Sequence, residues 1–344
     1  MRFLRPESVK LSGRGVAILA RLAALGAMGI ASGAVAQALW DSGNVRQPHL
    51  EKARAYAAQE KGWRHPGLGV CYWDDGQPLG NMTRDVSSRK VFDNLYFVGS
   101  GADDVWAIDT PDGIILIDAM SNPGEVDKYI LPGLKNVGLD PARLKLLIVS
   151  HGHADHFGGA QYLKERFGVR IIMSAVDWDI SKIQKLRPNQ SAAPARDETV
   201  ADGQTIRFGG VALKTFISPG HTPGSLSMLI PVTDKGKPQT LLYVSGISNK
   251  NLSPEMHAAF DRSYARLIRI ATENKVGGYI ASHGSFDDAI FKLEWMRANP
   301  TAPNPFLIGT RDTLLFLKEV RECNLNAADL HRLLPGRRTL RMAD

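Results

Sequence analysis

The stretch His151-Gly152-His153-Ala154-Asp155-His156 is the most informative part of this chain of 344 residues. It directly follows residues 144–150 (LKLLIVS), an almost continuous apolar run typical of a strand buried on both faces. A helix is predicted to begin near Gly158. In α/β folds, functional groups gather at the C-terminal ends of such strands. We therefore expect a functional site at this position.

The side chains of this stretch suit a divalent metal of borderline softness, because imidazole and carboxylate are its usual ligands. His151 and His153 would point the same way if the chain stays extended, because alternate residues share a face. Asp155 and His156 fall in the turn that follows and can point elsewhere. This geometry suits two adjacent metals better than one.

Further ligands are expected elsewhere, because four side chains make only part of a two-metal site. His221 lies in a Gly/Pro loop between two predicted strands, and His283 comes just after another strand. Both positions favour ligation. Asp118 ends an apolar strand, where it would accept the free N–H of a ligand imidazole, bind a backbone loop or cap a turn. The remaining histidines lack such settings and are expected to be ordinary residues: His49, His65, His257 and His331.

The rest of the pattern predicts one α/β domain. The predicted strands are 95–98, 105–109, 113–118, 144–150, 169–174, 205–208, 212–217, 226–231, 240–244 and 278–282. The predicted helices are 48–61, 123–137, 158–167, 176–185, 254–274, 286–297 and about 310–323. Both faces of the sheets need covering, and the helices are available for that.

These motifs, together with NLYFVGS (94–100), GIILIDA (113–119), SPGHTPGS (218–225) and SHGS (282–285), resemble the metallo-β-lactamase superfamily over residues 89–324. The resemblance implies an αββα sandwich, in which two mixed sheets pack face to face with helices on the outer faces. Many hydrolases of this superfamily, such as glyoxalase II and lactonases, carry a bridging Asp on the strand between the two late histidines. Residues 241–246 (LLYVSG) contain no Asp here, and no Cys as in the first two subclasses of class B β-lactamases.

The chain is therefore most similar to the third subclass of class B, the zinc β-lactamases. The resemblance implies two Zn²⁺ ions: one held by His151, His153 and His221, the other by Asp155, His156 and His283. A hydroxide between the metals would open the β-lactam amide, with Asp155 as the catalytic group that orients it. The resemblance also places contacts to the substrate carboxylate on one loop, at Ser245, Ser248, Asn249 and Lys250.

Two other functions stay open. One is another hydrolase of this fold, which would act on lactones, thioesters or phosphoesters, although the missing bridging Asp counts against it. The other is a zinc-binding protein without activity, against which the complete set of six ligands counts. The partner expected is a small molecule, a β-lactam or similar. The oligomeric state cannot be read from the sequence.

The first 36 residues predict a secretory signal peptide. Five basic residues precede the uncharged run 22–36 (LAALGAMGIASGAVA), which ends in a small-x-small cleavage signal near Ala36. The alternative is an uncleaved anchor, since 22–40 carries no charge and could barely span a bilayer. We expect cleavage, a periplasmic location and no stable membrane anchor.

The net charge of +7 depends on this segment, where five basic residues oppose one acid. Its removal leaves about +3 and no basic cluster with interleaved aromatics, so no nucleic-acid partner is expected. The organisation expected is a signal peptide at 1–36, an N-terminal arm at 37–88, the catalytic domain at 89–330 and a basic tail at 331–344. In an oxidising compartment Cys71 and Cys323 could pair, and two buried free thiols are the alternative.

Overall fold

The computed structural model describes residues 47–60, 67, 70–71, 86–249 and 252–333. Gln47–Leu330 belongs to one compact unit, and of the second unit only residues 331–333 are described. The predicted signal peptide, most of the N-terminal arm, His65, Lys250 and residues 334–344 of the predicted tail lie outside the described residues.

The first sheet has seven strands, hydrogen-bonded in sequence order. They are β1 (Arg89–Lys90), β2 (Leu95–Phe97), β3 (Trp106–Thr110), β4 (Gly113–Ile117), β5 (Leu144–Ile148), β6 (Arg170–Ser174) and β7 (Glu198–Val200). The pairs from β1 to β4 are antiparallel and those from β4 to β7 are parallel. β4 and β5 are buried along almost their whole length, as expected for parallel strands covered on both faces.

The second sheet has five strands in the order β12-β11-β10-β9-β8. They are β8 (Thr205–Phe208), β9 (Val211–Ile217), β10 (Leu226–Asp234), β11 (Lys237–Val244) and β12 (Gly278–Ala281). Only the β11–β12 pair is parallel, so this sheet is mixed as well. The parallel pair brings the end of β12, and the residues after it, beside the end of β11.

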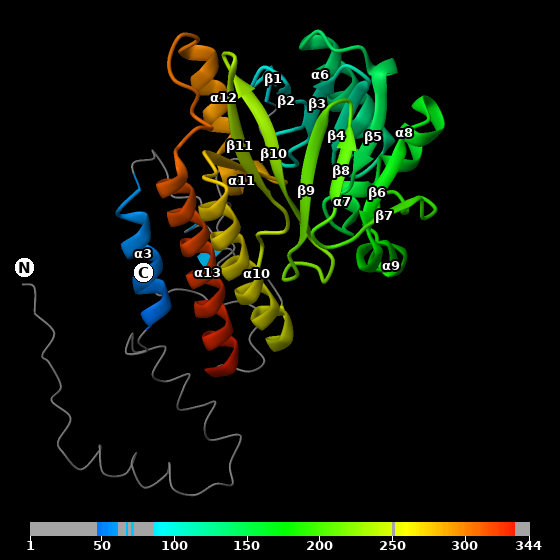
Figure 1. Cartoon of the computed structure of the whole chain (residues 1–344). Helices are drawn as coiled ribbons and strands as arrows, with labels where there is room; N and C mark the ends of the chain where they lie inside the picture. The colour runs from blue at the N-terminus through cyan, green and yellow to red at the C-terminus, as the bar shows by residue number, and fades with distance from the viewer. Residues whose placement is uncertain (1–46, 61–66, 68–69, 72–85, 250–251, 334–344) are drawn as a thin grey trace, which may run out of the picture. The chain divides into compact units, whose positions relative to one another are not determined.

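Helices cover the outer face of each sheet (Figure 1). On the first sheet these are α5 (Pro123–Glu125), a π-helical turn (Val126–Ile130), α6 (Leu131–Asn136), α7 (Ala154–Phe157), α8 (Ala160–Phe167) and α9 (Ala175–Ile183). On the second sheet they are α3 (Pro48–Ala57), α10 (Pro254–Glu273) and α13 (Thr310–Leu333). α11 (Gly284–Asp287) and α12 (Ala289–Ala298) follow β12.

The main core lies between the two sheets, and Trp106 is at its centre. This side chain is fully buried and meets Phe97 and Phe306 edge to face, with ring centroids 5.3 and 5.7 Å away. Its indole N–H donates to the carbonyl of Ala281 over 3.0 Å, which ties the first sheet to the end of β12. The αββα sandwich of two mixed sheets is confirmed.

Some element boundaries differ from the prediction. α13 continues ten residues beyond the predicted end at Cys323, because the buried Asn324 and Asn326 interrupt the apolar pattern without interrupting the helix. The predicted helix 158–167 begins two residues later, at Ala160 of α8, and a separate short helix, α7, precedes it at Ala154–Phe157. β1 and β7, two and three residues long, were not predicted.

Cys71 and Cys323 form a disulfide, with their Cα atoms 4.5 Å apart. This bond joins the N-terminal arm to α13. His49 of α3 contacts Glu322 of α13 over 2.5 Å, and His257 of α10 contacts Asn324 over 2.7 Å, so both histidines take part in helix packing. Of the alternatives that the sequence left open, the disulfide is the one present.

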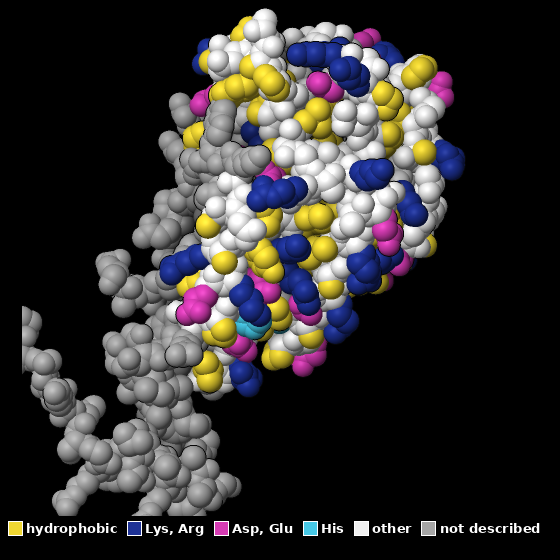
Figure 2. Space-filling model, turned by 60° about the vertical axis from the view of Figure 1, so that its left-hand side comes forward, with side chains coloured by type: hydrophobic (Ala, Val, Ile, Leu, Met, Phe, Trp, Pro, Cys, Tyr) yellow, Lys and Arg dark blue, Asp and Glu magenta, His cyan; other side chains and the backbone are white. Residues whose placement is uncertain are grey.

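Lys and Arg side chains are spread over the face drawn in Figure 2, with acidic and apolar side chains between them. The positive charge of this face is therefore distributed and does not form a single basic stripe. Within the described part of the chain, every helix is too short or too polar to cross a bilayer.

Candidate metal centre

Six side chains with metal-binding atoms meet in two groups of three. We call the first triad His151, His153 and His221, and the second triad Asp155, His156 and His283; within each, one donor atom per residue lies within 4.8 Å of the others. These are the two sets that the sequence analysis assigned. The triads adjoin, because the ring centroids of His151 and His156 are 4.0 Å apart.

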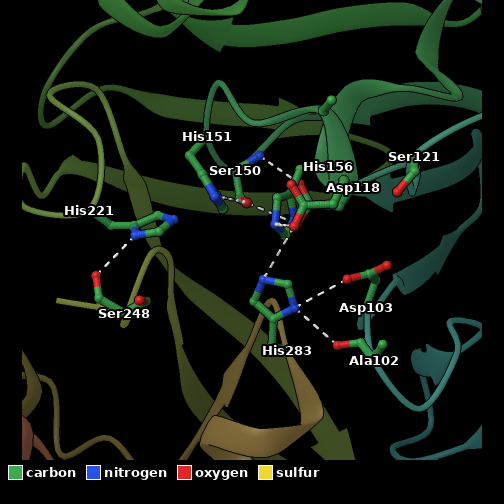
Figure 3. Close-up of polar contacts among 12 residues, drawn as sticks. Ala102, Asp103, Asp118, Ser121, Ser150, His151, His156, His221, Ser248 and His283 are labelled. Atoms are coloured by element: carbon green, nitrogen blue, oxygen red, sulfur yellow. Dashed lines mark hydrogen bonds and ion pairs between the residues drawn. The ribbon is translucent and has the colours of Figure 1, made fainter. Parts of the chain in front are cut away.

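The ends of strands and the loops after them deliver these side chains. His151 and His153 follow β5, and Asp155 and His156 lie on the short helix α7, for which His153 is the N-terminal cap residue. The other two come from the second sheet: His221 from the β9–β10 loop and His283 from the turn between β12 and α11. Figure 3 shows the rings of His151, His156, His221 and His283 turned toward one central region.

The first triad is compact and consists of imidazoles alone. Its ring centroids lie 4.9 Å apart for His151 and His153, 4.8 Å for His151 and His221, and 4.6 Å for His153 and His221. His151 is fully buried, whereas the other two rings are partly exposed. The exposed side of the triad is therefore the side of His153 and His221.

The second triad places a carboxylate between two imidazoles. Oδ2 of Asp155 lies 3.6 Å from Nε2 of His156 and 3.8 Å from Nε2 of His283. His156 is fully buried, whereas Asp155 and His283 are partly exposed. Both triads thus have a buried back, formed by His151 and His156, and a front open to solvent.

The donor set fits divalent metal ions. Nε2 of His151 and Nε2 of His156 are buried and have no hydrogen-bond partner among the described residues. Leaving a polar atom buried and unsatisfied costs about 1–3 kcal/mol, so two adjacent cases need a compensating ligand. Three imidazoles in one group, and a carboxylate with two imidazoles in the other, are sets that zinc binds in proteins.

Neutral acceptors hold the first triad. Nδ1 of His221 donates to the carbonyl of Ser248 over 2.9 Å (Figure 3). Nδ1 of His151 lies 3.1 Å from Oγ of Ser150 and 3.4 Å from Oγ of Ser245. With Nδ1 engaged, the Nε2 atom of each of these two rings is the one left for a metal.

Carboxylates hold the second triad. Nδ1 of His156 donates to Oδ2 of Asp118 over 2.9 Å, and Nδ1 of His283 contacts Oδ1 of Asp103 at 3.2 Å and the carbonyl of Ala102 at 3.0 Å. Asp118 was predicted to accept a ligand imidazole N–H, bind a backbone loop or cap a turn, and it makes the first two of these contacts. A carboxylate behind an imidazole fixes the ring orientation and makes it a more basic ligand.

Asp118 also connects the two triads. It is buried and accepts from the backbone N–H and the hydroxyl of Ser150 at 2.7 and 2.8 Å, and from the Tyr243 hydroxyl at 2.9 Å. Because the Ser150 hydroxyl also meets His151, the carboxylate reaches the first triad through one side chain and the second triad directly.

The pKa values of the first triad are low. Burial, with repulsion from neighbouring imidazoles, holds the pKa of His151 well below its usual value. Burial also lowers the pKa of His153 to about 4 and that of His221 to about 3. At neutral pH these rings are therefore uncharged and ready to ligate.

The second triad behaves in the opposite way. Burial would lower the pKa of His283, but the hydrogen bond and charge of Asp103 raise it to about 9. Burial also opposes the charge on His156, and Asp155 and Asp118 overcome this and raise its pKa. For Asp155, burial would raise the pKa, but His156 and His283 hold it below its usual value. Without a metal, this triad is a charged network.

The predicted substrate-contact residues do not form one surface. Ser245 is buried, and its hydroxyl contacts the Ser150 carbonyl at 3.1 Å, behind His151. Asn249 is buried and donates to the carbonyl of Cys323 over 3.4 Å. Ser248 is partly exposed and touches His221 through its carbonyl, while Lys250 lies outside the described residues. The side chains of Ser245 and Asn249 thus make contacts within the protein, and substrate contact at these residues stays a prediction.

Three residues that support the triads were not predicted from the sequence: Asp103, Tyr243 and Asp177. Asp103 lies in the loop GSGADD (99–104). Its Gly-rich composition indicates a turn, and its two adjacent aspartates indicate that the turn carries functional side chains. Tyr243 and Asp177 carry no local signal, because the groups that they contact are distant in the sequence.

Comparisons with known proteins agree with this geometry. The model of the metallo-β-lactamase superfamily matches residues 99–234. Over that stretch this chain is similar to the metallo-β-lactamase superfamily. Its fold is similar to that of a subclass B3 metallo-β-lactamase of Bradyrhizobium japonicum (TM-score 0.59, 22% identity, 75% of this chain and 97% of that one). It is also similar to the metallo-β-lactamase of Legionella gormanii (TM-score 0.63, 21% identity, 74% and 100%).

The curated relatives point to another branch of the superfamily. A hydroxyacylglutathione hydrolase of Chromohalobacter salexigens is 30% identical over 181 residues, which are 50% of this chain and 59% of that protein. One from Acidiphilium cryptum is 37% identical over 87 residues, 25% of this chain and 31% of that protein. The chain thus spans between about a third and three fifths of the length of these relatives.

Proposed function

We propose that this chain is an exported hydrolase with two zinc ions that opens the amide of β-lactams. The observation that carries the proposal is the second triad together with its surroundings. Asp155, His156 and His283 include no Cys, and the residue after β11 is the buried Ser245, where a bridging Asp is expected of thioesterases and lactonases. This combination resembles the third subclass of class B β-lactamases.

The two triads would each hold one zinc ion. Bound zinc supplies two things: it brings the pKa of a coordinated water to near 7, and it polarises a carbonyl oxygen. The residues of the chain prepare this chemistry. The first triad presents uncharged imidazoles, and the contacts of Asp118, Asp103 and Ser248 with Nδ1 atoms leave the opposite ring nitrogens for metals.

Asp155 has a second function in this proposal. Its side chain is about 30% exposed, and it lies between the two imidazoles of its triad. One carboxylate oxygen can serve as a ligand while the other accepts a hydrogen bond from the attacking water. It would thus orient the nucleophile toward a substrate carbonyl at the open front of the site.

The disulfide supports export. Structural disulfides form in oxidising compartments and are rare in the cytosol, and Cys71 and Cys323 are bonded. Together with the basic start and apolar run of residues 1–36, this favours a periplasmic location. N-terminal sequencing of the exported protein tests it: a start near Gln37 supports cleavage, and an intact N-terminus contradicts it.

A substrate panel tests the activity. Protein loaded with zinc is assayed on a penicillin, a cephalosporin, a carbapenem, a lactone, a phosphodiester and a hydroxyacylglutathione thioester, with His221→Ala as the inactive control. Zinc content is measured on the same samples, and we expect about two ions per chain. Fast β-lactam turnover supports the proposal, and fast turnover of another ester without β-lactam turnover overturns it.

The second candidate is a thioesterase. The sequence similarity to hydroxyacylglutathione hydrolases favours it, although it covers half of this chain or less in the pairs described above. Against it stands Ser245 at the end of β11, which offers no bridging carboxylate to the metals. The thioester in the panel decides between the two.

A further inference from the structure

Asp177, on helix α9, is a buried carboxylate that belongs to neither triad. Its side chain is fully buried, and it accepts three hydrogen bonds. Oδ2 accepts from the backbone N–H of Gly152 at 2.8 Å and from the hydroxyl of Thr222 at 2.6 Å. Oδ1 accepts from the backbone N–H of Gly224 at 2.9 Å. All three donors belong to loops that carry the first triad.

These contacts link two segments that are far apart in the sequence. Gly152 stands between His151 and His153, and Thr222 directly follows His221. The loop after β5 and the β9–β10 loop therefore meet on one carboxylate. The second triad has no such contact with Asp177: α7 and the turn after β12 do not reach it in any contact of the described residues.

The junction leaves no space for adjustment. A Cβ atom on Gly224 would come within 2.6 Å of Oδ1 of Asp177, and one on Gly152 within 2.8 Å of the Asp177 carbonyl oxygen. Ser174, the cap of α9, accepts from the backbone N–H of Asp177 at 3.2 Å and so fixes the residue itself. The relative position of the two loops thus depends on this side chain.

The contacts require a carboxylate. All three partners are donors, and an ionised carboxylate accepts at both oxygens without donating. An amide of the same shape would direct an NH₂ group at a backbone N–H on one side, which removes a hydrogen bond and adds a repulsion. Hydrogen bonds to a charged acceptor are also about twice as strong as neutral ones.

We infer that Asp177 is a positioning residue for the first metal site: it sets the distance of His221 from His151 and His153. The inference rests on the proposed function, because it assumes that the first triad binds a metal. One residue outside the ligand set would thus control the metal affinity of the first site and not that of the second.

The test is a metal titration of Asp177→Asn. Cobalt(II) replaces zinc, and its visible absorption bands report each site as it fills in the full chain freed of metal. We expect the affinity of the first site to fall about 10- to 100-fold, the range for losing an outer-shell partner, while the second site changes less than about threefold. The shape of the first-site bands should change, since the three imidazoles would no longer be held in the same geometry.

Two further variants separate positioning from a general loss of stability. Thr222→Val removes one of the three hydrogen bonds and keeps the volume, so a smaller effect in the same direction is expected. Asp287→Asn is the matched control: Asp287 is equally buried and accepts from the N–H groups of Ala281 and Ala289 over 2.8 Å each, beside the second triad. It should leave the first site unchanged.

The outcomes distinguish this inference from the proposed function. If the unmodified chain binds no cobalt at the triads, the proposed function fails before any variant is compared. If it binds two ions, and Asp177→Asn weakens neither site or both equally, the positioning role is overturned while the proposed function stands. An equal effect of Asp287→Asn on the first site would also overturn it.

Discussion

The two triads adjoin, yet their charges and supports differ. His153 and His221 have pKa values of about 4 and 3, and the Nδ1 atoms of His151 and His221 contact hydroxyl and carbonyl groups. His283 has a pKa of about 9, and its triad contains one carboxylate and is held by two more, Asp118 and Asp103. Metal binding to the first triad would therefore release no proton from its imidazoles, whereas metal binding to the second triad must release protons.

Removal of one ligand from each triad should have the largest effect. His221→Ala and His283→Ala should each lose one metal equivalent, a loss of affinity of more than about 100-fold, because a ligand contributes more than an outer-shell partner. Inductively coupled plasma mass spectrometry after dialysis measures the metal content. His257→Ala, which alters a buried histidine outside the triads, is the control. Unchanged metal content in either ligand variant would show that the residue is misassigned.

Asp118→Asn should weaken the second triad more than the first. The variant loses a charged acceptor for Nδ1 of His156, and we expect about 10- to 100-fold lower affinity at that site. The change reaches the first triad only through the Ser150 hydroxyl, so the first site should lose less metal affinity. Cobalt titration measures the affinity of each site separately. Equal losses of affinity at both sites would contradict a direct role of Asp118 at the second triad alone.

The pH dependence of metal uptake should separate the triads further. Below its pKa of about 9, His283 is protonated, so the affinity of the second site should fall about tenfold for each pH unit from 9 to 6. His153 and His221 stay neutral over that range, and the first site should change little. Titrations at fixed ionic strength measure both. Asp103→Asn removes the main cause of the raised pKa of His283, so the affinity of the second site should depend less on pH in this variant. An equal pH dependence of the two sites in the unmodified chain would refute the difference between the triads.

Loss of the disulfide should have the smallest effect on the metals. Replacement of Cys71 and Cys323 by Ser should lower the free energy of unfolding by about 2–5 kcal/mol without changing the metal content of the folded protein. Urea unfolding of the metal-free forms measures it. A lower metal content of the zinc-loaded variant in the absence of urea would instead connect the disulfide to the site, through the contact of Asn249 with Cys323.

The sequence predicted the site better than its supports. His151 to His156 form one short segment after a buried strand, and His221 and His283 stand in loops at strand ends, so local patterns sufficed to find them. The partners of Asp177 lie 25, 45 and 47 residues away, and Tyr243 meets Asp118 across 125 residues. Such contacts arise only from the packing of the two sheets.

Contacts between distant segments also account for features that local patterns did not indicate. Ser245 and Asn249 lie in a polar loop, and nothing local indicates that their side chains turn inward. The last turns of α13 were missed because Asn324 and Asn326 are buried through bonds to His257 and Gln47, partners that a hydropathy pattern cannot reveal. The arrangement of two sheets with helices outside came from the family resemblance and not from the periodicity.

The disulfide has one more consequence, for the fate of a damaged molecule. Both sheets and all six candidate ligands lie between Cys71 and Cys323, whose bond spans 252 positions of sequence. The chain between them is a covalent ring. A protease that cuts one exposed loop opens this ring but releases no fragment from it. A nicked molecule would keep both halves of its candidate metal centre until a reductant reaches the bond.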